Sequence, residues 1–191
     1  VGAYTAAMLV VRGGVPFLIA LPLAGVAACI VSLVMYPTLR LKGDYFAIAA
    51  LGFGEAIRLI VENGGKLTGG ARGFTGIPTL TKLPIALAIA ALGLYFMRNI
   101  IYSRFGRSMI AIREDRLAAQ SIGINVAKNQ MLSLAISAFY CGVAGGLFAF
   151  FMAFIQPRMF DMGKSNELAA SVVFGGLGSL TGAVVAAAIL T

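Results

Sequence analysis

Two charged side chains with the potential for chemistry lie inside an otherwise apolar stretch, residues 45–61. Glu55 and Arg58 are three positions apart and would share one face of a helix. A charged pair at membrane depth is costly, so it should face protein or a water-filled cavity. The pair could line a path for a polar solute and hold the two charged ends of a zwitterion. It could also be a structural pair between helices, or an interfacial pair near the end of a helix.

A second charged group occupies residues 98–128, between two apolar runs of bilayer length. Six of the fifteen Lys and Arg residues lie in this interval, with two of the seven acids: Arg98, Arg104, Arg107, Arg113, Arg116 and Lys128, with Glu114 and Asp115. A segment with charges of both signs cannot sit in hydrocarbon, so we expect a folded loop on one membrane face. Its positive charge predicts the cytoplasmic face.

Helix-capping residues divide this loop. Asp115 can cap the N-terminus of a short helix over residues 116–122, and Asn125 can cap the helix that follows. Gly123 stands where a left-handed C-terminal cap favours glycine. These residues predict one short helix between two spans. Asp44 is a comparable N-cap for the helix over residues 45–61.

Several kinds of chemistry are excluded or disfavoured by what the chain lacks. It has no His, which excludes a His-ligated metal or a Ser-His-Asp triad built from this chain. It has no Gly-x-x-x-x-Gly-Lys-Ser/Thr phosphate loop. Its basic residues fall between apolar runs, so they do not indicate nucleic acid. We expect no cofactor, no metal and no enzymatic activity, since Glu55 and Arg58 are too few for an intramembrane active site.

Composition places these residues in an all-α, polytopic membrane helical bundle. The chain has 191 residues, of which 60% are apolar and 12% charged, against about 45–50% and 25% in soluble domains. Mean hydropathy is +0.93, and the apolar runs are continuous, whereas membrane β-strands alternate. The predicted spans are residues 15–35, 45–61, 83–102 and 131–155. Gly142 and Gly146 predict a small-residue face for close packing in the last of these.

The remaining segments complete one transmembrane domain over residues 1–191. Residues 62–82 and 156–167 are polar connections, expected on the external face. Residues 168–174 and the stretch after Gly182 are short apolar segments joined by glycines, which predicts a broken helix or a tight helical hairpin. Both ends of the chain lie in apolar sequence, so we expect a fragment of a longer permease-like chain.

The motifs resemble one family of transporters. Ala118, Ala119 and Gly123 resemble the EAA loop of ABC-importer permeases, although Leu117 stands where the broad pattern has Glu. Further strings resemble branched-chain amino-acid permeases of the LivM type in the same order: LRLKGDYFAI (39–48), LGFGE (51–55), LTGG (67–70), SRFGR (103–107), AIRED (111–115), GINV (123–126) and VFGGLGSLTG (173–182). The family usually has Pro-Asn-Gly where this chain has Ala71-Arg72-Gly73.

The resemblance implies a permease subunit of an ATP-driven importer in the bacterial inner membrane. The implied partners are two cytoplasmic ATPases, a homologous second permease forming a heterodimer, and a periplasmic amino-acid-binding protein. Residues 103–127 would be the cytoplasmic coupling loop, holding a short coupling helix against an ATPase. The residues expected to couple to the ATPase are Arg113, Glu114, Asp115, Ala118, Ala119 and Gly123.

Two other transport functions remain open. Permeases for urea and short amides are close relatives, and the departure at Ala71-Arg72 leaves the cargo undecided between these and branched-chain amino acids. A proton-coupled secondary transporter would use Glu55 as the proton carrier and would need no ATPase. The helix predicted in the charged loop and the absence of His argue against this second alternative.

Overall fold

The structure is a computed structural model that describes residues 1–41, 44–65, 68–176 and 178–190. Its helices and an isolated bridge between Phe74 and Ile155 confirm the predicted all-α class. The α-helices are α1 (Gly2–Val11), α2 (Phe17–Val34), α3 (Asp44–Glu62), α4 (Leu83–Tyr102), α5 (Arg104–Glu114), α6 (Arg116–Ser121), α7 (Val126–Met152), α8 (Met162–Gly175) and α9 (Leu180–Leu190). Short 3-10 turns are η1 (Tyr36–Arg40), η2 (Gly70–Arg72) and η3 (Pro157–Phe160).

The core is the packing of α1 and α2 against α7, and it is built from small side chains. Ala6, Ala24 and Ala149 are fully buried there. A Cβ atom on Gly142 would lie 2.7 Å from the Ala28 Cβ and 2.8 Å from the Ala24 carbonyl oxygen. One on Gly146 would lie 2.8 Å from Leu21. The backbones therefore approach closely along this face, which confirms the predicted small-residue packing of α7.

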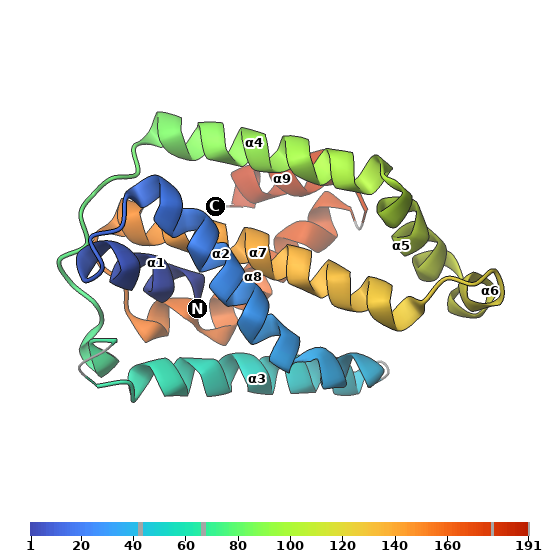
Figure 1. Cartoon of the computed structure of the whole chain (residues 1–191), viewed down its shortest axis with the longest axis horizontal. Coiled ribbons are helices and arrows are strands. Elements are labelled where there is room, and N and C mark those ends of the chain that lie inside the picture. Colours follow the sequence, from blue (N-terminus) through green and yellow to red (C-terminus); the bar gives the residue numbers. More distant parts are fainter. Residues whose placement is uncertain (42–43, 66–67, 177, 191) are drawn as a thin grey trace.

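Two helices flank this core with little covering them. Figure 1 shows α3 on one side of α1, α2 and α7 and α4 on the other. Among the described helices, α2, α4 and α7 are long and apolar enough to cross a membrane. No residue of α4 is buried. The predicted span over residues 45–61 does form helix α3, but its charged residues keep it out of that set.

The C-terminal glycines form a tight helical hairpin of α8 and α9, one of the two arrangements expected. A Cβ atom on Gly175 would lie 2.6 Å from Ala183, so the two helices meet at glycine. The expected connection over residues 156–167 is wrong in length, because α8 already begins at Met162. Asp161 caps it by accepting a hydrogen bond from the Lys164 amide at 3.1 Å.

The end of α7 also differs from the predictions. Helix α7 begins at Val126, directly after its predicted cap Asn125 and ahead of the apolar run over residues 131–155. It ends at Met152, earlier than residue 155, and Ala153 turns the chain with a φ of 57°. The chain then pairs with the connection over residues 62–82, where Phe74 and Ile155 exchange backbone hydrogen bonds of 2.8 and 3.2 Å. The Asp44 side chain, Leu67 and Leu177 lie outside the described part of the chain, so the Asp44 cap stays a prediction.

Candidate functional site

The charged loop folds into two helices where the sequence predicted one. Ser103 separates α4 from α5, since its hydroxyl donates to the Ile100 carbonyl at 2.5 Å and accepts from the Gly106 amide at 3.3 Å. A Cβ atom on Gly106 would lie 2.5 Å from the Ile100 carbonyl oxygen, so glycine permits this sharp elbow. Ser103 was the available signal for α5, because serine is a favoured N-cap.

The short second helix, α6, ends as the capping residues predicted. The Asp115 carboxylate accepts hydrogen bonds from the Leu117 amide at 2.8 Å and the Ala118 amide at 3.0 Å. Gly123 has a φ of 86° and ends the helix in the left-handed region. Asn125 accepts from the Lys128 amide at 3.0 Å and starts α7. The position of α6 is therefore set by local hydrogen bonds at both ends.

The six predicted coupling residues divide by exposure. Arg113 and Glu114 are exposed and form an ion pair with a nitrogen–oxygen distance of 2.8 Å. Asp115, Ala118 and Gly123 are exposed as well. Ala119 is instead buried, with 2% of its surface exposed. Ala119 thus holds α6 against the rest of the chain and does not present its side chain to a partner.

Two large apolar side chains on this segment were not among the predicted site residues. Leu117 is 77% exposed and Ile122 is 74% exposed. Leu117 lies in the capped helix α6 and Ile122 follows its last residue. This helix lies at one extreme end of the molecule (Figure 1). Exposed apolar side chains beside charged ones are typical of a surface that another protein covers. The signal was present at Leu117, which departs from the Glu of the broad motif.

A cavity of about 490 Å³ lies beside α5. Its walls come from α4, α5 and α7 and from the turn between α8 and α9: Met97, Ile100, Ile101, Phe105, Gly106, Met109, Ile110, Arg113, Ser133, Ile136, Ser137 and Gly178. A Cβ atom on Gly178 would lie 2.8 Å from Nη1 of Arg113. Arg113 therefore joins the charged loop to the α8–α9 hairpin, a proximity that the sequence did not predict.

The charged residues of α3 form a cluster on one helix. Arg58 Nε lies 3.0 Å from both carboxylate oxygens of Glu55, and Arg58 Nη1 lies 3.5 Å from Glu62. Asp161, before α8, is close enough to act electrostatically on both Glu55 and Arg58. The ion pairs of Arg58 with Glu55 and Glu62 are within α3, which does not match a pair between helices. Glu62 was missed because the sequence analysis placed it in the connection over residues 62–82, whereas it is the last residue of α3. Asp161 was missed because only the fold brings it near this cluster.

The two candidate sites lie toward opposite ends of the molecule. Helix α3 begins near the end that carries α6 and runs away from it (Figure 1). Arg58 and Glu62 are in its last two turns. The α3 cluster is therefore separate from the charged loop.

Comparison with known sequences assigns this arrangement to a family. The family described as "Branched-chain amino acid transport system / permease component" matches residues 1–191. The chain belongs to this family. The family resemblance indicated by the motifs is therefore confirmed. Membership of a permease family, together with three helices long and apolar enough to cross a membrane among the described residues, makes the chain a multi-pass membrane protein.

Named relatives agree with the family. The high-affinity branched-chain amino acid transport system permease proteins LivM of Salmonella typhimurium and Escherichia coli are 34% and 33% identical to the chain, covering 100% of it and 53% of each relative. The probable branched-chain amino acid transport permease protein LivH of Methanocaldococcus jannaschii is 29% identical, covering 97% of the chain and 64% of the relative. The chain thus spans about half the length of the LivM relatives. No solved structure matches it significantly.

Proposed function

We propose that the chain is part of the membrane-spanning permease of an ATP-driven ABC importer for branched-chain, hydrophobic amino acids. The observation that carries this proposal is the match along the whole chain to the LivM permeases. The working transporter is a heterodimer with a second, homologous permease, in the bacterial inner membrane. Two cytoplasmic ATPases and a periplasmic amino-acid-binding protein complete it.

In this proposal α6 is the coupling helix and residues 103–127 form the coupling loop. The exposed side chains of Leu117 and Ile122 enter an apolar groove of an ATPase, while Arg113, Glu114 and Asp115 provide charge complementarity at its rim. The end caps at Asp115 and Gly123 keep α6 rigid. A displacement of α6 is then carried as a unit through α5 to the spans that it contacts.

The movement reaches the membrane through two contacts of α5. Its first turn joins α4 at the Ser103 elbow, and its last turn brings Arg113 to the α8–α9 turn at Gly178. ATP-dependent closure of the ATPases would therefore tilt α4 and the hairpin together. We assign to this tilt the alternation between access from outside and access from inside.

Glu55 and Arg58 are placed in the translocation path in this proposal. Their side chains are 34% and 22% exposed, so they are accessible to a solute while remaining paired. A zwitterionic amino acid offers an ammonium group for Glu55 and a carboxylate for Arg58. Glu62 and Asp161 add negative charge beside Glu55, so the ammonium group of an amino acid is attracted to this cluster more strongly than neutral urea.

The test is transport by the intact permease, co-expressed with its partner permease and ATPases and reconstituted in liposomes. Leucine and urea uptake are measured with the binding protein present, with ATP and with a non-hydrolysable ATP analogue as the control. ATP-dependent leucine uptake supports the proposal. ATP-dependent urea uptake retains the importer and changes its cargo. Uptake that follows the proton gradient and ignores ATP contradicts the proposal and favours a secondary transporter.

A further inference from the structure

The cavity beside α5 is a largely apolar chamber with a polar end. Its volume of about 490 Å³ falls within the range of about 300–1,000 Å³ typical of ligand sites. Most of its lining residues have apolar side chains from α4, α5 and α7: Met97, Ile100, Ile101, Phe105, Met109, Ile110 and Ile136. Such a lining suits an alkyl chain and gives no site for a small polar solute.

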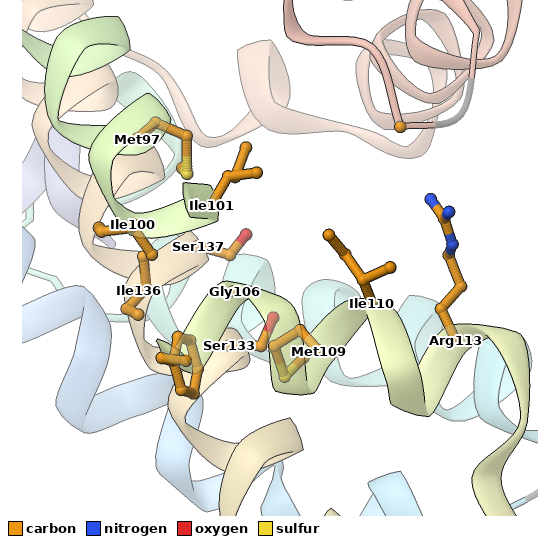
Figure 2. Close-up of a pocket in the computed structure, with 12 residues that line it drawn as sticks. Met97, Ile100, Ile101, Gly106, Met109, Ile110, Arg113, Ser133, Ile136 and Ser137 are labelled. Carbon is orange, nitrogen blue, oxygen red and sulfur yellow. The ribbon is translucent and has the colours of Figure 1, made fainter. Parts of the chain in front are cut away.

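Polar groups enter the cavity at two places only among its lining residues. Ser133 and Ser137 of α7 contribute hydroxyl groups, and Figure 2 shows them between the apolar end, near Met97 and Ile136, and the end occupied by Arg113. Arg113 donates from Nε and Nη2 to Glu114, while Nη1 lies beside Gly178 at the cavity wall. Ile110 lies between the two serines and Arg113 in the same view, so the lining is apolar on both sides of the hydroxyl groups and ends at the guanidinium.

The neighbouring residues place this cavity at the level of lipid headgroups. The Arg98 guanidinium lies 5.8 Å from the centre of the Tyr102 ring, and Tyr102, the last residue of α4, is 70% exposed. Aromatic and basic side chains at the end of a span are typical of the membrane–water interface. Arg104 and Arg107 follow within the next two turns. The cavity mouth is therefore in a net positive region where an apolar span ends.

The pair between Arg113 and Glu114 does not block an anion. The two side chains are 60% and 69% exposed, and exposed pairs contribute little because water already solvates both partners. Guanidinium groups bind phosphate with two parallel hydrogen bonds. A phosphate at the mouth can therefore replace Glu114 as the partner of Arg113, whereas an apolar protein helix in this cavity would leave the guanidinium without a new partner.

We infer that this cavity binds one anionic phospholipid, with an acyl chain against α4 and α5 and the phosphate at Arg113. A mainly apolar lining that ends at one exposed guanidinium fits an acyl chain joined to an anionic headgroup. Basic pockets between membrane helices on the cytoplasmic side recognise anionic headgroups in this way. A lipid bound here contacts the coupling loop, a membrane span and the α8–α9 turn at once.

The experiment measures retained lipid, so its outcome does not depend on the cargo or on coupling. The intact permease, with its partner subunits, is placed in nanodiscs with equal amounts of phosphatidylglycerol and phosphatidylcholine. Lipids retained after detergent extraction are counted by native mass spectrometry. One Arg near the surface contributes about 1 kcal/mol toward an anionic lipid, so the wild type is expected to retain phosphatidylglycerol about fivefold over phosphatidylcholine.

Three variants and one control locate the site. Arg113→Gln is expected to bring the retention ratio close to one, and Arg113→Lys to preserve most of the preference because the charge remains. Ser137→Phe fills the cavity and should lower retention of both lipids. Arg116→Gln, which removes an exposed charge of α6 outside the cavity, should leave the ratio unchanged.

Other results overturn the inference. Equal retention of the two lipids by the wild type, or the same loss of preference in Arg116→Gln as in Arg113→Gln, would mean that the preference comes from diffuse surface charge. Unchanged retention in Ser137→Phe would place the lipid elsewhere. Cross-linking of Ser137→Cys to the partner permease would show that protein fills the cavity. A failure of transport with the lipid result intact would contradict the proposed function alone.

Discussion

Replacement of Gly123 by Val should uncouple ATP hydrolysis from transport. Gly123 has a φ of 86°, and no atom lies within 4 Å of the position where a Cβ would be. A side chain at this position therefore meets no steric obstacle. The free-energy cost of the substitution is that of holding an L-residue in the left-handed region, about 1–2 kcal/mol. A cost of this size lowers the population of the present turn about 5- to 30-fold. The turn ends α6, where the Ile124 amide donates to the Ala119 carbonyl at 3.0 Å.

The assay is the ratio of leucine taken up to ATP hydrolysed, in liposomes containing the intact transporter. We expect this ratio to fall at least fivefold in Gly123→Val, with ATP hydrolysis continuing. The ratio should fall less in Gly123→Asn than in Gly123→Val, because Asn tolerates the left-handed region. Gly76→Val is the matched control, since Gly76 has a φ of 80° and equally open surroundings but lies in the connection before α4. It carries the same backbone strain away from α6.

Two results would refute this reasoning. A normal ratio in Gly123→Val would mean that the turn after α6 does not transmit the movement of the ATPase. An equal fall in Gly76→Val would mean that backbone strain acts through general destabilisation and not through the coupling helix. Thermal unfolding of both variants, measured in the same detergent, separates these cases.

Three further predictions concern packing, capping and the charged cluster. Gly142→Ala should overpack the contact between α2 and α7 and lower the free energy of unfolding of the purified permease by about 1–3 kcal/mol, measured by thermal unfolding. The control Gly93→Ala, whose new Cβ would lie 3.5 Å from Tyr140, should have little effect. Equal effects of the two variants would contradict the close approach of α2 and α7. Asp115→Ala removes the N-cap and should reduce the stability of α6 by about 1 kcal/mol. Amide hydrogen exchange in its first turn should then rise about fivefold. Asp115→Asn should restore protection, since Asn also caps helices; a failure to do so would mean that the negative charge itself is required. Glu55→Gln should reduce leucine uptake without a matching loss of thermal stability. The control Glu167→Gln, in the exposed pair with Lys164, should leave uptake unchanged. A loss of stability alone in Glu55→Gln would mean that the pair of Glu55 and Arg58 serves packing.

The accuracy of the sequence predictions followed the range of the forces involved. The cap at Asp115 and the left-handed turn at Gly123 were predicted correctly because they involve groups only a few residues apart. The start of α7 after Asn125 was predicted correctly for the same reason. The start of α8 was misplaced because the apolar run was taken as the limit of the helix, whereas Asp161 caps it before that run. Helix α5 was missed since its polar residues resembled a loop, although Ser103 marks its start.

The sequence by itself determined that the chain is an all-α membrane bundle, where its longest spans lie, and that it carries the motifs of branched-chain amino-acid permeases. Hydropathy and capping are properties of contiguous residues, so no fold is needed to recognise them. Only the tertiary structure decided that Ala119 is buried while Leu117 is exposed, and that Arg113 reaches Gly178. It also decided that Asp161 lies close enough to α3 to act electrostatically on Glu55 and Arg58. These relations join residues that are distant in the chain, and the packing of backbones at small residues sets which side chains meet.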